Sequence, residues 1–185
     1  MNVQRLSIPD LILITPTRLA DSRGFFSETW NAKAYAEAGI PAAFVQDNHS
    51  LSTQRGIVRG LHLQIPPYAQ GKLVRCSHGS IWDVAIDVRR DSPTYLRHVS
   101  VVLSGENWQQ LWIPPGFLHG FCTLAPESEV IYKVTAEYDR ASERGVIWND
   151  PDLDISWPIE AHEAVLSKKD TELPRFRDCP TWFRH

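Results

Sequence analysis

Short runs of alternating residues, separated by glycines and prolines, constrain the fold of this chain more than any other feature. The clearest run lies between Ser80 and Val88, where apolar residues recur with the period of two typical of a strand with one buried face. The other elements expected from the pattern are strands over 97–103, 109–113 and 129–138 and short helices over 31–38 and 160–169. Many short strands with turn residues between them predict an all-β fold, an antiparallel sandwich or barrel with a few short peripheral helices.

Two tyrosines on the last of these strands are candidates for a pocket. Tyr132 and Tyr138 share one face of the strand expected over 129–138, and they stand about 20 Å apart if that strand is unbroken. Both phenols could simply fill the core. Alternatively, one serves chemistry at the centre of a barrel pocket while the other lies at its rim.

Composition narrows the class of protein. A length of 185 residues suits one domain, expected over 1–185. The formal net charge of −3 gives no electrostatic case for nucleic acid or an anionic membrane as partner. Three cysteines, an odd count without metal-site spacing, indicate reduced thiols in a cytoplasmic protein. Neither a cleaved signal nor a bilayer-spanning run is expected.

One stretch carries candidate chemistry. His62 lies in the run Arg59–Gln64, and Lys72 follows ten residues after it on the same β-rich wall. An imidazole can accept a proton at neutral pH, and an ammonium can balance the negative charge left behind. A base and a cation are the minimum equipment for removing hydrogen from a carbon next to a carbonyl, although a surface histidine on a loop is the simpler explanation of this stretch alone.

Two short signatures are similar to those of the cupin barrel. One is the PxGxxH pattern that ends at His119, and the other is Gly56 followed by His62. Metal-binding cupins carry HxH at the first signature, whereas this chain has Gln64 in place of the second histidine. His62 and His119 alone make a poor ligand set for zinc or iron. The chain therefore resembles a metal-free cupin, a jelly-roll barrel.

A more specific resemblance covers nearly the whole length. The chain resembles the dTDP-4-dehydrorhamnose 3,5-epimerase family in the segments 21–28, 46–50, 59–62, 70–75, 113–121, 132–133 and 147–151. This resemblance implies inversion of C3 and C5 of a dTDP-linked 4-keto-6-deoxyhexose without metal or organic cofactor. It also implies a homodimer in which N-terminal strands cross to the partner.

The resemblance assigns roles to particular residues. His62 is the implied base, Asp170 orients it, Lys72 balances enolate charge and Tyr132 returns a proton from the opposite face of the sugar. Tyr138 matches a position that stacks on thymine. The other implied substrate-binding residues are Arg23, Glu28, Asp47, Asn48, His49, Arg59, His119, Glu143 and Lys168. In the exchanged dimer, Arg23 and Glu28 would serve the neighbouring subunit.

Three alternatives stay open at this point. An epimerase that inverts only C5 or only C3 would keep the same four catalytic positions. A non-catalytic sugar-binding cupin would bind the ligand without exchanging its hydrogens with solvent. A metal-dependent cupin oxygenase would bind iron, and Gln64 in place of histidine argues against it.

Overall fold

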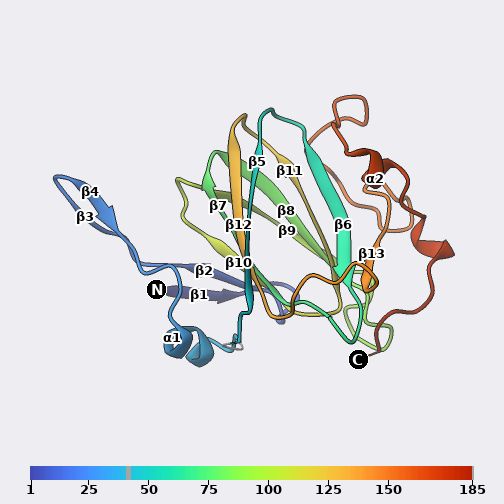
Figure 1. The fold of residues 1–185 in the computed structure, drawn as a ribbon, viewed down its shortest axis with the longest axis horizontal. Coiled ribbons are helices and arrows are strands. Elements are labelled where there is room, and N and C mark those ends of the chain that lie inside the picture. The colour runs from blue at the N-terminus through green and yellow to red at the C-terminus, as the bar shows by residue number, and fades with distance from the viewer. Residues whose placement is uncertain (41–42, 185) are drawn as a thin grey trace.

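The structure, a computed structural model, describes residues 1–40 and 43–184. Two antiparallel sheets face each other, and a separate hairpin projects from them (Figure 1). In hydrogen-bonded order, the six-stranded sheet contains β1 (Asn2–Arg5), β2 (Ile12–Thr15), β10 (Gln110–Ile113), β7 (Lys72–His78), β12 (Ser128–Val134) and β5 (Gln46–Ser52). The five-stranded sheet contains β13 (Glu143–Gly145), β6 (Val58–Gln64), β11 (Phe117–Thr123), β8 (Ser80–Asp87) and β9 (His98–Ser104). The hairpin pairs β3 (Leu19–Asp21) with β4 (Gly24–Phe26).

The core lies between the two sheets. Val74 and Leu111 of the six-stranded sheet pack in one cluster with Ile81, Phe117 and Phe121 of the five-stranded sheet. Burying both inner faces against each other removes apolar side chains from water, and this stabilises a sandwich or barrel. The predicted all-β jelly roll of antiparallel strands is confirmed.

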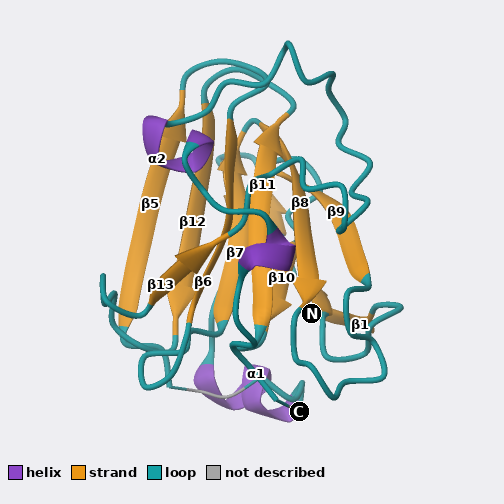
Figure 2. Ribbon diagram, turned by 90° about the vertical axis from the view of Figure 1, so that its right-hand side faces the viewer, coloured by secondary structure: helices purple, strands orange, loops and turns teal. Residues whose placement is uncertain are grey.

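Helices are short and peripheral (Figure 2). The predicted first helix is confirmed as α1 (Ala32–Glu37), where the Asn31 side chain accepts a hydrogen bond from the Ala34 backbone and caps the helix. The helix predicted over 160–169 is wrong. Up to residue 184, the C-terminal region forms only α2 (Lys168–Thr171) and a 3₁₀ turn (Phe176–Asp178). No helix in the described ranges is long and apolar enough to cross a membrane.

The segment before α2 is extended because it packs against the barrel. Val165 pairs in parallel with Ile57. The Val58 N–H donates to the Val165 carbonyl, and the Val165 N–H donates to the Gly56 carbonyl. Leu166 packs beside Val58 in a small apolar cluster. An extended segment places successive side chains on alternate sides. In this conformation Val165 can pair with Ile57 while Leu166 packs against Val58.

Strand β8 is buried on both faces, so the prediction of one buried face is wrong. Ile81 packs between the sheets, while Val84 and Ile86 pack in a second cluster outside the five-stranded sheet. The chain after β13 coats this outer face, and Figure 1 shows it along the side of β6 and β13. Asp87 is fully buried at the end of β8. Its carboxylate accepts hydrogen bonds from Arg89, Ser92 and Thr94.

Strand β12 is shorter than the expected run over 129–138. It ends at Val134, and the residues from 135 to 139 form no strand. Tyr132 therefore lies on the strand, whereas Tyr138 lies on the loop that follows it. Within β12, Val130, Tyr132 and Val134 point inward, since the two valines are fully buried and Tyr132 packs against the core.

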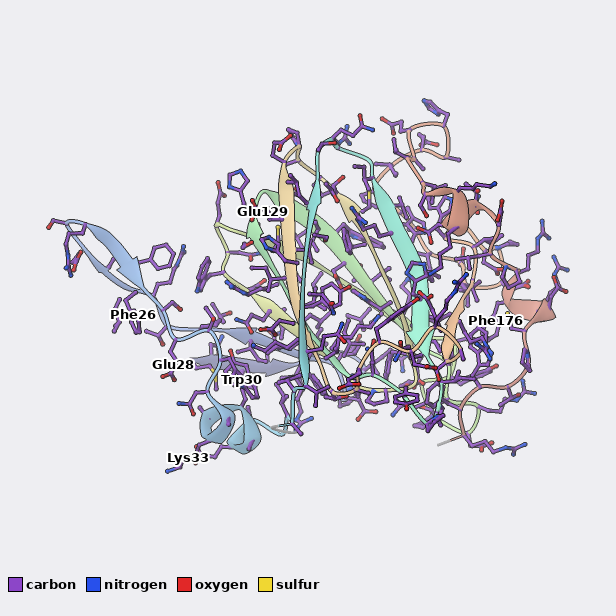
Figure 3. All side chains as sticks on the ribbon, viewed as in Figure 1. Phe26, Glu28, Trp30, Lys33, Glu129 and Phe176 are labelled. Atoms are coloured by element: carbon purple, nitrogen blue, oxygen red, sulfur yellow. The ribbon has the colours of Figure 1, made fainter. Side chains whose placement is uncertain are left out.

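The β3–β4 hairpin stands apart from the barrel. Figures 1 and 3 show it pointing away from both sheets, with Phe26 on it and Glu28 near its base. Phe25 and Phe26 are exposed over more than half of their surface, at 51% and 69%. Large exposed aromatic side chains on a projecting hairpin are typical of a surface that meets a partner.

Candidate active site

A cavity of about 430 Å³ opens between the two sheets. Both sheets contribute to it, and the segment just before and within α2 closes one side. Its lining includes Ser50, Val58, Arg59, His62, Lys72, His119, Phe121, Tyr132, Val165, Lys169 and Asp170. A smaller hollow of about 150 Å³ shares His62, Lys72 and Tyr132 and extends to Gln46, Asn48, Gln64, Gln70, Tyr138 and Glu143. Concave sites of this total size suit a small organic ligand.

His62 is held by a buried carboxylate. Its Nε2 lies 2.6 Å from Oδ1 of Asp170, whose side chain is only 5% exposed. Asp170 sits in the first turn of α2, where its backbone N–H donates to the Ser167 hydroxyl. Burial by itself would raise the pKa of Asp170, but the hydrogen bonds with His62 and Ser167 outweigh burial and hold that pKa below its usual range. An ionised Asp170 fixes the orientation of the imidazole and stabilises it when it is protonated.

Two glycines bring the histidine strands together. Gly60 of β6 has φ +125°, a conformation that L side chains rarely adopt. A Cβ there would lie 2.7 Å from Cα of Gly120 on β11. Their close approach aligns His62 opposite His119 in the sheet register. Larger residues at Gly60 or Gly120 would push β6 away from β11 and displace the cavity wall.

Lys72 lies beneath the cavity with a lowered pKa. Burial lowers the pKa of its ammonium from 10.5 to about 8, against the opposing attraction of Asp83 and Glu143. Asp83 is fully buried, and its Oδ2 lies 2.9 Å from Nε2 of His119. Its Oδ1 has no hydrogen-bond partner among the described residues. Burial also lowers the pKa of His119, so the geometry fits a neutral ring that donates from Nε2 to Asp83.

Tyr132 faces His62 across the cavity. It belongs to β12 of the six-stranded sheet, whereas His62 belongs to β6 of the five-stranded sheet, and both line the two hollows. Burial raises the pKa of the Tyr132 phenol, so it stays protonated at neutral pH. A group that can accept a proton and a group that can donate one therefore line the same cavity from different sheets.

Tyr138, Glu143 and Lys169 meet at the rim. The Tyr138 hydroxyl donates to Oε2 of Glu143 over 3.0 Å, and the Lys169 ammonium pairs with Oε1 of the same carboxylate. Burial opposes the charge on Glu143, but the hydrogen bonds from Lys169 and Tyr138 lower its pKa overall. This contact ties the loop after β12, the strand β13 and the α2 segment together beside the opening.

Arg59 and Asn48 also belong to the cavity. Arg59 lines the larger hollow while its guanidinium donates to the Ser52 hydroxyl and the Leu51 carbonyl. Asn48 lines the smaller hollow, where it accepts a hydrogen bond from the Gln46 side chain. Arg59 thus brings a fixed cation to the larger hollow, and Asn48 brings an amide to the smaller one.

Other candidates from the sequence lie outside the lining. On β5, Asp47 and His49 point to the opposite face from Asn48, where Asp47 pairs with Lys133 and His49 with Glu129. Alternation along β5 separates these neighbours, and it also brings Gln46 and Ser50 inward, two residues that the motif alone did not single out.

Of two neighbouring lysines, Lys169 lines the cavity and the predicted Lys168 does not. Lys168 is 90% exposed and lies near Glu172, whereas Lys169 lines the cavity and pairs with Glu143. Arg23 is on the projecting hairpin and pairs with Asp21, and Glu28 lies at the base of that hairpin (Figure 3). The chain's own cavity includes neither Arg23 nor Glu28.

No cluster of three or more His, Cys, Asp or Glu side chains within 1–40 and 43–184 is arranged to hold a metal ion. His62 and His119 each face a carboxylate, and the side chain of Gln64 makes hydrogen bonds to the backbone. The sulfhydryl groups of Cys76, Cys122 and Cys179 are free.

Comparison with known proteins gives one consistent answer. A profile described as dTDP-4-dehydrorhamnose 3,5-epimerase matches residues 5–178. The dTDP-4-dehydrorhamnose 3,5-epimerase of Shigella flexneri is 50% identical over 180 residues, 97% of this chain and 98% of that protein.

Solved structures similar to this chain include a 3,5-epimerase and a 3'-monoepimerase. A Legionella pneumophila dTDP-6-deoxy-D-glucose-3,5-epimerase in complex with dTDP-4-keto-L-rhamnose superposes with a TM-score of 0.94 at 42% identity, covering 100% of this chain and 98% of that one. A 3'-monoepimerase from Streptomyces bikiniensis in complex with dTDP-quinovose is less similar, with a TM-score of 0.84 at 32% identity over 92% and 85% of the two chains.

Proposed function

The chain belongs to the dTDP-4-dehydrorhamnose 3,5-epimerase family, and from that premise we propose how its own residues carry out the reaction. The protein is an isomerase that inverts C3 and C5 of dTDP-4-dehydro-6-deoxy-D-glucose to give dTDP-4-dehydro-L-rhamnose. One observation carries the proposal: the His62–Asp170 pair, Lys72 and Tyr132 line the same cavity.

Proton removal is assigned to His62. The C4 ketone of the substrate acidifies the hydrogens on C3 and C5, so a weak base can remove either one if the enolate is stabilised. Asp170, 2.6 Å from the imidazole, stabilises the imidazolium that forms. The Lys72 ammonium supplies positive charge for the enolate oxygen in a partly dry site, where such stabilisation is strong.

Proton return is assigned to Tyr132. Inversion of a carbon requires that the proton leave from one face of the sugar and return to the other. His62 and Tyr132 stand on facing sheets, which supports this division of labour. The chemistry uses the substrate's own ketone as electron sink, so we propose that neither metal nor organic cofactor takes part.

The remaining cavity residues form the nucleotide-sugar grip. Arg59 and a lysine of the α2 segment would meet the diphosphate, where guanidinium and ammonium groups suit phosphate oxygens. Lys169 fits this role better than Lys168, because it lines the cavity. Tyr138 at the rim would stack on the thymine. Residues 1–185 would then act as one domain, and the free thiols favour a cytoplasmic location.

A homodimer with exchanged N-terminal strands would complete the site. The projecting hairpin, its exposed Phe25 and Phe26, and the position of Arg23 away from its own cavity support this proposal. Mixing inactive His62→Asn and Arg23→Ala proteins tests it. In an exchanged dimer, one of the two mixed sites carries both native residues, so activity should reappear. If mixing under conditions that exchange subunits restores nothing, Arg23 does not act across the dimer.

Deuterium labelling tests the reaction. In deuterated water, dTDP-4-dehydro-6-deoxyglucose should take up label at C3 and C5, and His62→Asn should abolish both while leaving dTDP binding intact. Proton NMR of the product counts the labelled and inverted centres. Label at one carbon alone would identify a monoepimerase, and binding without any exchange would identify a sugar-binding protein.

A further inference from the structure

The loop after β12 is held by glutamine side chains in place of a strand. Four backbone groups of residues 136–139 bond to them. Gln70 Nε2 donates to the Ala136 carbonyl over 2.8 Å, Gln64 Nε2 donates to the Glu137 carbonyl over 3.1 Å, the Tyr138 N–H donates to Gln46 Oε1 over 3.0 Å, and the Asp139 N–H donates to Gln64 Oε1 over 2.8 Å. We call Gln46, Gln64 and Gln70 the glutamine clamp.

Gln64 is the centre of the clamp. Its side chain is almost fully buried, and its Nε2 also donates to the Tyr68 carbonyl over 2.7 Å. One amide therefore uses two donors and one acceptor on three backbone groups at once. Glutamate lacks the donors, and histidine cannot present two donors and an acceptor in this arrangement. Metal-binding cupins carry the second histidine of HxH at this position, whereas here the side chain makes hydrogen bonds to backbone groups.

The clamp bears directly on one residue of the rim. Tyr138 is more than half exposed, at 55%, and among the described residues its side chain makes one hydrogen bond, from its hydroxyl to Glu143. Its backbone lies between the two groups that Gln64 binds, Glu137 and Asp139. The position of an exposed ring at the cavity mouth thus depends on how firmly its backbone is fixed.

We propose that Gln64, assisted by Gln70, is a positioning residue that presents the Tyr138 ring to the nucleotide before the substrate arrives. The proposal rests on the proposed function, in which Tyr138 stacks on the base. A ring fixed in its binding position loses less conformational freedom on binding, so the clamp contributes to affinity more than to turnover.

Kinetics and binding test this directly. Gln64→Leu should raise KM and the Kd for dTDP by about tenfold, a change in affinity comparable to the loss of one buried hydrogen bond. The kcat and its pH profile should change little. Gln70→Ala removes a single bond and should raise both constants about threefold, which keeps the test available if Gln64→Leu folds poorly. Gln110→Leu is the matched control, because Gln110 is equally buried but bonds to Thr29 and Tyr35 on another part of the sheet.

Amide hydrogen exchange separates the clamp from the role of Tyr138. The Tyr138 and Asp139 N–H groups should exchange faster in Gln64→Leu and unchanged in Gln110→Leu. In a Tyr138→Ala background, Gln64→Leu should give no further loss of dTDP affinity. Unchanged exchange, or an equal rise in KM for Gln110→Leu, overturns the clamp. Faster exchange combined with normal dTDP binding by Tyr138→Ala overturns the assignment of Tyr138 instead.

Discussion

The charge on Lys72 should set the alkaline limit of activity. Burial lowers the pKa of this ammonium from 10.5 to about 8, a difference worth roughly 3 kcal/mol against the charged form. Lys72 is then charged in about nine molecules of ten at neutral pH and in about one of ten at about pH 9. If the ammonium stabilises the enolate, kcat/KM should fall on the alkaline side with an apparent pKa of about 8.

Lys72→Arg is the informative perturbation, because a guanidinium stays protonated throughout this range. A poorer fit of the guanidinium would lower the rate of the variant at every pH, so the shape of the profile is the readout: its alkaline fall should disappear up to about pH 10. Three neighbouring groups are not expected to cause an alkaline fall near pH 8, because the pKa of Tyr132 is raised and those of His119 and Glu143 are lowered.

Two further variants sharpen the assay. Lys133→Arg changes a lysine of β12 that pairs with Asp47 on the other face, so its profile should match the wild type. Asp83→Asn removes a charge that raises the pKa of Lys72, so its alkaline fall should move to lower pH. Initial rates across the pH range, with folding checked at each pH, give all four profiles. An alkaline fall that persists unchanged in Lys72→Arg would refute the reasoning.

Three other outcomes are expected. Asp170→Asn should lower kcat by roughly 10²- to 10⁴-fold with little change in KM, because the carboxylate acts through His62; steady-state kinetics check this, and an unchanged kcat contradicts it. Tyr132→Phe should impair complete inversion while His62-dependent deuterium uptake continues, as proton NMR can show. Asp87→Asn should destabilise the fold by about 2 kcal/mol at neutral pH. Burial opposes the charge on Asp87, yet the hydrogen bonds that it accepts lower its pKa from 3.8 to about 2, so its stabilisation is present above pH 3.8 and lost as the pH falls through about 2. Urea unfolding at several pH values should therefore show a shallower acid loss in the variant.

Sequence periodicity predicted the strands well where a strand has regular neighbours. The runs that became β8, β9 and β10 were recognised because their alternation reflects the sheet itself. Periodicity failed where partners distant in sequence decide the conformation. The expected strand over 129–138 stops at Val134 because side-chain amides take over its backbone hydrogen bonds. The expected helix over 160–169 is a turn followed by an extended segment before α2, because Val165 pairs with Ile57.

The candidate site divides in a similar way. The resemblance to the family grouped His62, Lys72, Tyr132 and Asp170, which the structure places around one cavity. Motifs did not say which face of a strand or turn each residue occupies. Alternation along β5 would have separated Asp47 and His49 from Asn48, but no local pattern distinguishes Lys168 from Lys169, because α2 is too short for a periodic signal. Two of the three backbone contacts of Gln64 depend on a loop more than 70 residues away and leave no trace in the sequence.

The contact between His62 and Asp170 joins positions 108 residues apart. His62 lies in the barrel, and Asp170 lies in the segment after β13 that covers the five-stranded sheet. If the pair acts as proposed, activity requires that the segment after β13 stay packed on the barrel. Because small segments can open without global unfolding, warming should abolish activity at a lower temperature than that at which the β-sheets unfold. Turnover would then report on local opening of this segment. Prompt recovery of activity on cooling would identify its reversible detachment from the barrel as the cause of the loss.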